Sequence, residues 1–182
     1  MKTKLLVMYA LFIALAVIGA QIKVAGSIAF DSLPGFLAAL VLGPVAGAVI
    51  AFIGHMVSAV LVGFPLSIPI HLLVAVIMAL AAYMVGLTFR VLERPVRVGP
   101  DADDELKREA KSGRRLTAYI ASTVVGYVIN VILGLLAMLP FLGNGVMALF
   151  FPLTTVALMN LILADIIYGA LPRDIQLYGE KL

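Results

Sequence analysis

Residues 34–71, PGFLAALVLGPVAGAVIAFIGHMVSAVLVGFPLSIPIH, decide the fold of this chain. The stretch contains both histidines of the protein and none of its Asp, Glu, Lys or Arg residues, and Gly43-Pro44 and Phe64-Pro65 divide it. An apolar run with so few polar groups predicts membrane helices around a polar pocket. The piece 33–42 is too short for the roughly 20 residues of a full crossing. We therefore expect a short, tilted or sunken helix there, followed by a full helix over 44–62.

Composition places the chain among integral membrane proteins with a single bundle. Of its 182 residues 63% are hydrophobic and only 13% are charged, whereas soluble domains carry about 25% charged residues. The absence of cysteine excludes disulfides and thiolate metal sites. Lys2 and Lys4 ahead of an apolar run resemble a signal peptide. That run is long enough to span a bilayer, so we interpret it as the first helix.

Helix breakers and run lengths divide the chain into six apolar segments. The charged stretch 93–115, with prolines near its start, predicts a cytoplasmic loop, and a short surface helix over 101–111 is the alternative. The sequence thus predicts an all-α membrane protein, a bundle of six transmembrane helices at about 5–22, 33–42, 44–62, 67–92, 116–138 and 145–170.

The positive charges fix the predicted orientation. With the N-terminus inside, the cytoplasmic parts carry 12 of the 13 Lys and Arg residues, and only Lys23 lies outside. This bias predicts that both termini are cytoplasmic. The 12 residues are Lys2, Lys4, Arg90, Arg94, Arg97, Lys107, Arg108, Lys111, Arg114, Arg115, Arg173 and Lys181.

In this orientation, polar residues from several segments fall in the outer half of the membrane or near its middle. Polar groups inside a bilayer need partners, so they should turn inward. We expect a pocket that opens outward, with hydrogen bonds between helices as the alternative for each residue. Asp165 lies lower, near the cytoplasmic side, where we expect a structural role. The candidate substrate-binding residues are Asp31, Ser32, His55, His71, Tyr127, Asn130 and Asn160.

Motifs of enzymes are missing from the sequence. It has no Gly-x-Ser-x-Gly turn, no His-Glu-x-x-His zinc motif and no P-loop. No basic surface with interleaved aromatic residues suggests nucleic acid. We therefore expect no catalytic residue, no cofactor and no metal. Two other hypotheses stay open: a small membrane enzyme that uses His55 or His71, and a structural or channel-forming membrane protein.

Three motifs carry a resemblance that covers nearly the whole chain. They are Ala10-x-x-x-Ala14 in the first helix, the segment LGPVAGA at 42–48, and Gly54-His55-x-x-Ser58-Ala59. In their order, and in a small six-helix frame, they resemble the substrate-binding S component of energy-coupling factor (ECF) vitamin transporters.

The resemblance implies a cell-membrane subunit of an ECF-type ABC transporter that binds a vitamin-like small molecule from outside. Its partners would be a membrane coupling subunit and two cytoplasmic ATPases, which hydrolyse the ATP. Ala10 and Ala14 would form the docking face for the coupling subunit, and residues 23–32 would form a lid. Small residues four apart do permit close helix contact.

The substrate is constrained by what the sequence lacks. Leu163 stands where riboflavin-type members carry a lysine, three residues after Asn160, which argues against riboflavin. The absence of Trp argues against thiamine-type stacking pockets. A site with amide, imidazole and phenol groups and one carboxylate suits a neutral or weakly cationic heterocycle bearing a sugar or hydroxymethyl group. Candidates are α-ribazole, pyridoxine and a thiazole precursor.

Overall fold

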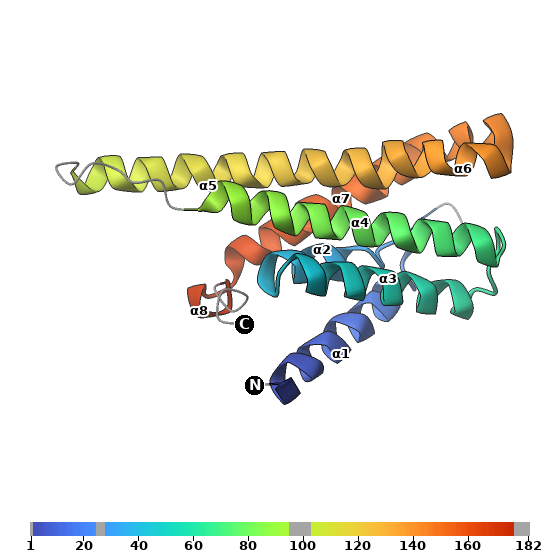
Figure 1. The fold of residues 1–182 in the computed structure, drawn as a ribbon, viewed down its shortest axis with the longest axis horizontal. Helices are drawn as coiled ribbons and strands as arrows, with labels where there is room; N and C mark the ends of the chain where they lie inside the picture. The colour runs from blue at the N-terminus through green and yellow to red at the C-terminus, as the bar shows by residue number, and fades with distance from the viewer. Residues whose placement is uncertain (1, 25–27, 95–102, 177–182) are drawn as a thin grey trace.

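The structure is a computed structural model that describes residues 2–24, 28–94 and 103–176 (Figure 1). Over these residues the chain is almost wholly helical, with one two-stranded antiparallel hairpin between the first two helices. The elements are α1 (Lys2–Gly19), β1 (Lys23–Val24), β2 (Ile28–Ala29), α2 (Leu33–Val41), α3 (Pro44–Leu61), α4 (Ile68–Glu93), α5 (Asp104–Tyr127), the π-helical segment η1 (Val128–Leu133), α6 (Gly134–Leu142), the 3-10 segment η2 (Gly143–Leu149), α7 (Phe150–Ala170) and α8 (Arg173–Gln176).

The short helix α2 forms the centre of the bundle. All its residues except Leu33 are buried, and it packs against α1, α3, α4 and α7. The chain reverses at Gly43, whose φ of 113° favours glycine, and Pro44 then opens α3. Gly47 of α3 lies directly against Ala39, and a Cβ at Gly47 would stand 2.6 Å from the Ala39 Cα. Small residues thus let α2 and α3 pack backbone to backbone.

The charged segment departs from the prediction of a loop over 93–115, because it is helical from Asp104 onward. Asp103 caps this helix, since the Leu106 N–H donates to its Oδ1 at 2.7 Å, and acidic residues occupy the first turn. Both features stabilise a helix start. Residues 95–102 of the predicted loop lie outside the described residues. The fifth helix therefore begins well before residue 116 and extends past the rest of the bundle (Figure 1).

The structure also differs from the prediction over residues 139–144, the gap between the predicted helices 116–138 and 145–170. The helix continues through Pro140 to Leu142, and the chain reverses at Gly143, whose φ is +58°. The next segment, η2, is 3-10 helix, so α7 begins at Phe150 instead of residue 145. In Figure 1 α7 then runs back at an angle to α5, passing behind α4 toward α8.

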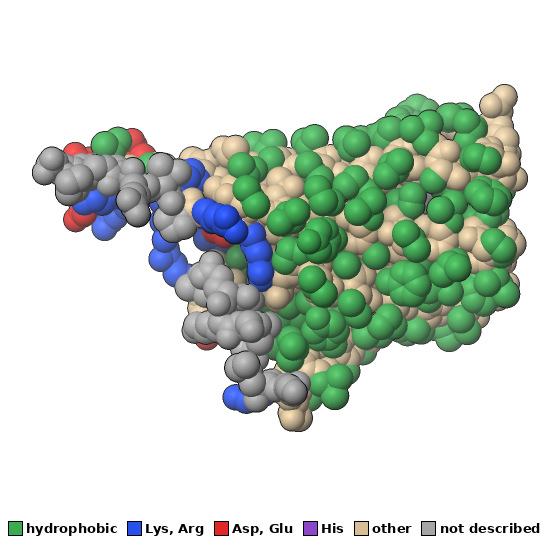
Figure 2. Space-filling view, viewed as in Figure 1, with side chains coloured by type: hydrophobic (Ala, Val, Ile, Leu, Met, Phe, Trp, Pro, Cys, Tyr) green, Lys and Arg blue, Asp and Glu red, His purple; other side chains and the backbone are tan. Residues whose placement is uncertain are grey.

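The helical surface is suited to a bilayer. Within the described residues three helical runs are long and apolar enough to cross a membrane: Pro44–Leu61, Ile68–Glu93 and Asp104–Ala170, while the apolar stretch Thr3–Gly19 is shorter. Large apolar side chains such as Leu6 and Phe151 are exposed. Charged side chains gather at the end of the molecule where α5 begins, whereas the remainder of this face is mainly hydrophobic (Figure 2). The fold is therefore an all-α membrane bundle.

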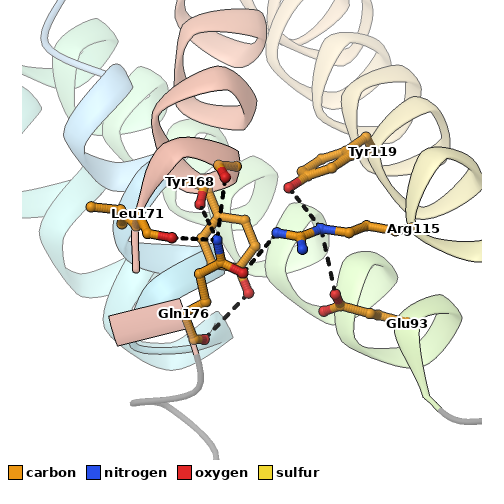
Figure 3. Close-up of polar contacts among 7 residues, drawn as sticks. Glu93, Arg115, Tyr119, Tyr168, Leu171 and Gln176 are labelled. Atoms are coloured by element: carbon orange, nitrogen blue, oxygen red, sulfur yellow. Dashed lines mark hydrogen bonds and ion pairs between the residues drawn. The ribbon is translucent and has the colours of Figure 1, made fainter. Parts of the chain in front are cut away.

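Arg115 joins several helix ends at the charged end of the bundle (Figure 3). Its Nη2 donates to Gln176 Oε1 at 2.8 Å and its Nε donates to Tyr119 Oη at 3.2 Å. The Nε also lies 3.8 Å from Glu93 Oε1. Gln176 Nε2 in turn donates to the carbonyls of Leu171 and Tyr168 at 2.7 and 2.9 Å. These contacts fasten α8 to the ends of α4, α5 and α7.

The predicted orientation can be tested on two exposed positions at opposite ends of the bundle. We expect Gly113→Cys, near the start of α5, to react with an impermeant thiol reagent only from the cytoplasmic side. Asn144→Cys, in η2, should react only from outside. The reason is that 12 of the 13 Lys and Arg residues fall on the predicted cytoplasmic side. The parent chain has no cysteine and provides the unlabelled control. The reverse pattern would contradict the orientation.

Candidate functional site

A cavity opens among the helices at the end of the bundle opposite to Arg115. The volume that the centres of water molecules could occupy inside it is about 100 Å³. A single water needs about 10–15 Å³ of such volume. The cavity therefore has room for several waters or a small organic molecule. Six of the seven predicted binding residues line it, namely Asp31, Ser32, His55, His71, Asn130 and Asn160.

Three of these residues form a hydrogen-bonded chain. Asp31, just before α2, has its Oδ2 3.0 Å from His55 Nδ1, and His55 Nε2 lies 3.3 Å from His71 Nδ1. His55 comes from α3 and His71 from the first turn of α4, where Pro69 occupies a position that needs no N–H donor. Asp31 and His71 are each only 6% exposed. We call these three residues the Asp31–His55–His71 relay.

Two asparagines of the lining come from other elements than the relay residues. Asn160 of α7 donates its Nδ2–H to Ser32 Oγ at 2.8 Å, which ties α7 to the start of α2. Asn130 lies on η1, where the helix widens to a π-helical turn. Such turns occur often at functional sites because they shift side chains out of the regular register. Both amides are buried and line the cavity.

Tyr127 does not line the cavity. Its hydroxyl lies 3.3 Å from Thr154 Oγ1, so it bridges α5 and α7 instead. In a regular α-helix Tyr127 and Asn130, three residues apart, share one face, which is why the sequence groups them. The π-helical segment begins immediately after Tyr127 and changes that register. Tyr127 thus makes a contact between helices, and a binding role for it stays a prediction.

The apolar wall of the cavity was not predicted from the sequence. Apolar side chains are too common in this chain for any of them to stand out. The wall consists of Leu66, Leu73, Val74, Ile77, Met78, Met138, Leu149, Leu153, Val156 and Ala157, with Gly134 beside them. Together with the polar residues, they give the mixed lining that is typical of small-molecule sites.

Within the described part of the chain, no group of three or more His, Asp or Glu side chains is placed to hold a metal ion. Asp165, which lies away from the cavity on α7, accepts a hydrogen bond from Thr123 Oγ1 at 2.7 Å. This bond joins α7 to α5, and a structural role for Asp165 stays a prediction.

The small residues of α1 occupy two different faces. Ala16 and Ala20 are buried, and Ala16 packs against Gly54 of α3. Ala10 and Ala14 are exposed, and large exposed side chains such as Leu11 and Leu15 lie beside them. The Ala10–Ala14 face is therefore not used for packing by the described residues of this chain. Residues 25–27 of the predicted lid lie outside the described residues.

The fold and the cavity define an integral membrane protein that binds a small molecule between its helices. A model of the family described as "ECF transporter, substrate-specific component" matches residues 4–171, and the chain belongs to that family. Comparisons with curated proteins and with solved structures gave no match.

Membership of the family defines what the chain does in general terms. It is a substrate-binding subunit of an ECF transporter, so it is not itself an enzyme. It is a multi-pass protein of the cell membrane and works with the membrane and ATPase subunits of the transporter.

Proposed function

We propose that this subunit binds a vitamin or vitamin precursor in the cavity lined by the Asp31–His55–His71 relay. The substrate is a neutral heterocycle that carries a sugar or hydroxymethyl group, with α-ribazole, pyridoxine and a thiazole precursor as the candidates. The observation that carries the proposal is the convergence of six polar residues from the predicted set on one apolar-walled cavity.

The charge of the lining supports a neutral substrate. Among the side chains that the structure describes, which leave out those of residues 23–29, the one carboxylate of the lining is Asp31 and no Lys or Arg belongs to it. An anionic substrate would face this carboxylate with no Lys or Arg of the described lining to offset its own desolvation. The amides of Asn130 and Asn160 can both donate and accept, which suits hydroxyl groups.

Mass spectrometry of the purified protein tests the proposal directly. A small molecule that co-purifies in stoichiometric amount, and whose mass fits a neutral heterocycle, supports it. Calorimetry with α-ribazole, pyridoxine and hydroxyethylthiazole then identifies the preferred compound. A strongly anionic co-purifying molecule, or the absence of any ligand together with no binding in calorimetry, would contradict the proposal.

Removal of single polar groups from the cavity should weaken binding moderately. We expect His71→Ala and Asn130→Ala each to lower affinity about 2- to 13-fold, because a lost hydrogen bond to a neutral partner costs about 0.5–1.5 kcal/mol. Leu72→Ala is the matched control, since Leu72 neighbours His71 on α4 but is exposed on the outside of the bundle. Isothermal calorimetry measures the affinities. If both cavity variants bound like the Leu72 variant, the polar residues would only connect helices.

We further propose that Ala10 and Ala14 form the docking face for the membrane coupling subunit. Their exposure and the close approach that alanine permits support this assignment. The face lies on α1, and α1 contributes no residue to the lining of the cavity, so substrate binding and docking can be disturbed separately.

A further inference from the structure

Gly134 lines the cavity at the point where η1 passes into α6. Its φ of −58° and ψ of −49° are those of an ordinary right-handed helix, so the backbone conformation does not require glycine there. Inside a helix, glycine is less favourable than alanine, because it loses more conformational freedom on folding. The presence of glycine at this position therefore needs another explanation.

Packing does not require glycine at this position either. A Cβ at Gly134 would have Ile77 Cγ2 as its nearest neighbour among the described residues, at 3.7 Å, which is an ordinary van der Waals contact. Gly126 is also buried and lies on the same helical run. A Cβ there would stand 2.6 Å from Val85 Cγ2 and 2.7 Å from Leu161 Cδ2. A Cβ would likewise come closer than 3.0 Å to another atom at the remaining buried glycines that the structure describes, namely Gly35, Gly43, Gly47, Gly54 and Gly86.

The space beside Gly134 therefore belongs to the cavity, and it is apolar. Ile77 of α4 lines the cavity, and so does Met138, which lies one helical turn beyond Gly134 on α6. We propose that Gly134 is a specificity-determining residue, and that the apolar, methyl-bearing edge of the substrate ring occupies the space left by its missing side chain. The inference rests on the proposed function, because it takes this cavity as the binding site of a heterocycle.

The polar part of the lining fits this placement of the ring. Asn130 precedes Gly134 by about one turn of the same helical run and also lines the cavity. A ring whose apolar edge lies at Gly134 can direct a hydroxyl group toward the Asn130 amide, which both donates and accepts hydrogen bonds. Hydroxyethylthiazole, pyridoxine and α-ribazole each carry at least one methyl group on the ring together with hydroxyl groups. All three compounds therefore serve as probes.

The variant Gly134→Ala separates this role from a role in packing. Because alanine is the better helix residue and its Cβ has room, we expect the detergent-solubilised variant to unfold at the same temperature as the parent chain or at a higher one. Its affinity for the probe that binds the parent chain should fall about 5- to 150-fold, because the added methyl group overpacks the space that the ring needs. Isothermal calorimetry measures the affinity.

Two other glycines of the chain provide controls. Gly126→Ala should lower the unfolding temperature, because the buried Val85 and Leu161 would have to move. Gly145→Ala, in η2, should change neither unfolding nor binding, since no described atom outside its own helix lies within 4 Å of a Cβ there. If Gly134→Ala unfolded early like Gly126→Ala, or bound the probe like Gly145→Ala, the inference would be overturned while the proposed function stood.

Probes without their ring methyl groups test which part of the substrate lies at Gly134. The probe that binds and its demethylated analogue are each measured on the parent chain and on Gly134→Ala. We expect the substitution to weaken binding of the demethylated analogue by only about 2-fold or less, because the alanine methyl group then replaces the one that the analogue lacks, and changes to groups in contact are not additive. Equal losses for both ligands would overturn the inference. If none of the three probes bound the parent chain, the proposed function would fail, and the inference with it.

Discussion

Gly47→Leu is expected to destabilise the bundle by about 3 kcal/mol or more, the upper end of the usual range for overpacked cores. A Cβ at this position would stand 2.6 Å from the Ala39 Cα and 2.8 Å from the Ala39 nitrogen. Both are backbone atoms of a fully buried helix, so no side chain can rotate away. The substitution should force α2 and α3 apart and open the core that positions Asp31 and His55.

Gly113→Leu is the matched control, because among the described residues no atom outside the helix's own backbone lies within 4 Å of a Cβ built at that position of α5. Thermal unfolding of the detergent-solubilised proteins, followed by size-exclusion chromatography, compares the two variants with the parent chain. We expect the Gly113 variant to unfold like the parent and the Gly47 variant to unfold at a much lower temperature. Equal unfolding temperatures for both variants would contradict the close packing of α2 on α3.

The parts of the fold that the sequence predicts well depend on local breakers and long apolar runs. Gly43-Pro44 marks the reversal between α2 and α3 because glycine permits the positive φ and proline suits a first helical turn. The charged segment was harder to interpret. Its composition fits both a solvated loop and a helix with a capped, acidic start, and Asp103 provides the cap that favours the helix.

The residues of the predicted pocket were grouped by their expected depth in the membrane more than by the helix face on which they lie. Depth follows from the position of a residue along its helix, so residues from different helices, such as His71 and Asn160, could be grouped without knowing the packing. Predicting which face of a helix a residue occupies requires the helical register. The segment η1 shifts that register next to Tyr127. Nothing in the run VINVIL marks a π-helical turn, so the sequence grouped Tyr127 with Asn130, although Asn130 lines the cavity and Tyr127 does not.

The relay itself could not be predicted. Asp31, His55 and His71 lie on three segments, and their atomic contacts depend on how α2, α3 and α4 pack together. The sequence predicted that both histidines lie in the outer half of the membrane, but hydrogen bonds of 3.0 and 3.3 Å require the packed structure.

Ala10→Trp and Ala14→Trp are each expected to abolish most substrate uptake while leaving substrate binding to the isolated subunit intact. Both alanines are exposed on α1 and lie one helical turn apart, so an indole ring there would hold a partner helix several ångströms away. Overpacking an interface typically costs about 1–3 kcal/mol, which is about a 5- to 150-fold loss of association. Co-purification with the coupling subunit and uptake into vesicles measure the loss.

Two further variants show whether the effect belongs to this face. Ile120→Trp enlarges an exposed residue of α5, on the opposite side of the bundle from α1 (Figure 1), and should leave uptake unchanged. Ala16→Trp enlarges a fully buried residue of α1 and should lower binding and uptake together, because it disrupts the core. If Ala10→Trp and Ala14→Trp behaved like Ala16→Trp, their face would pack inside the subunit. If they behaved like Ile120→Trp, docking would use another surface.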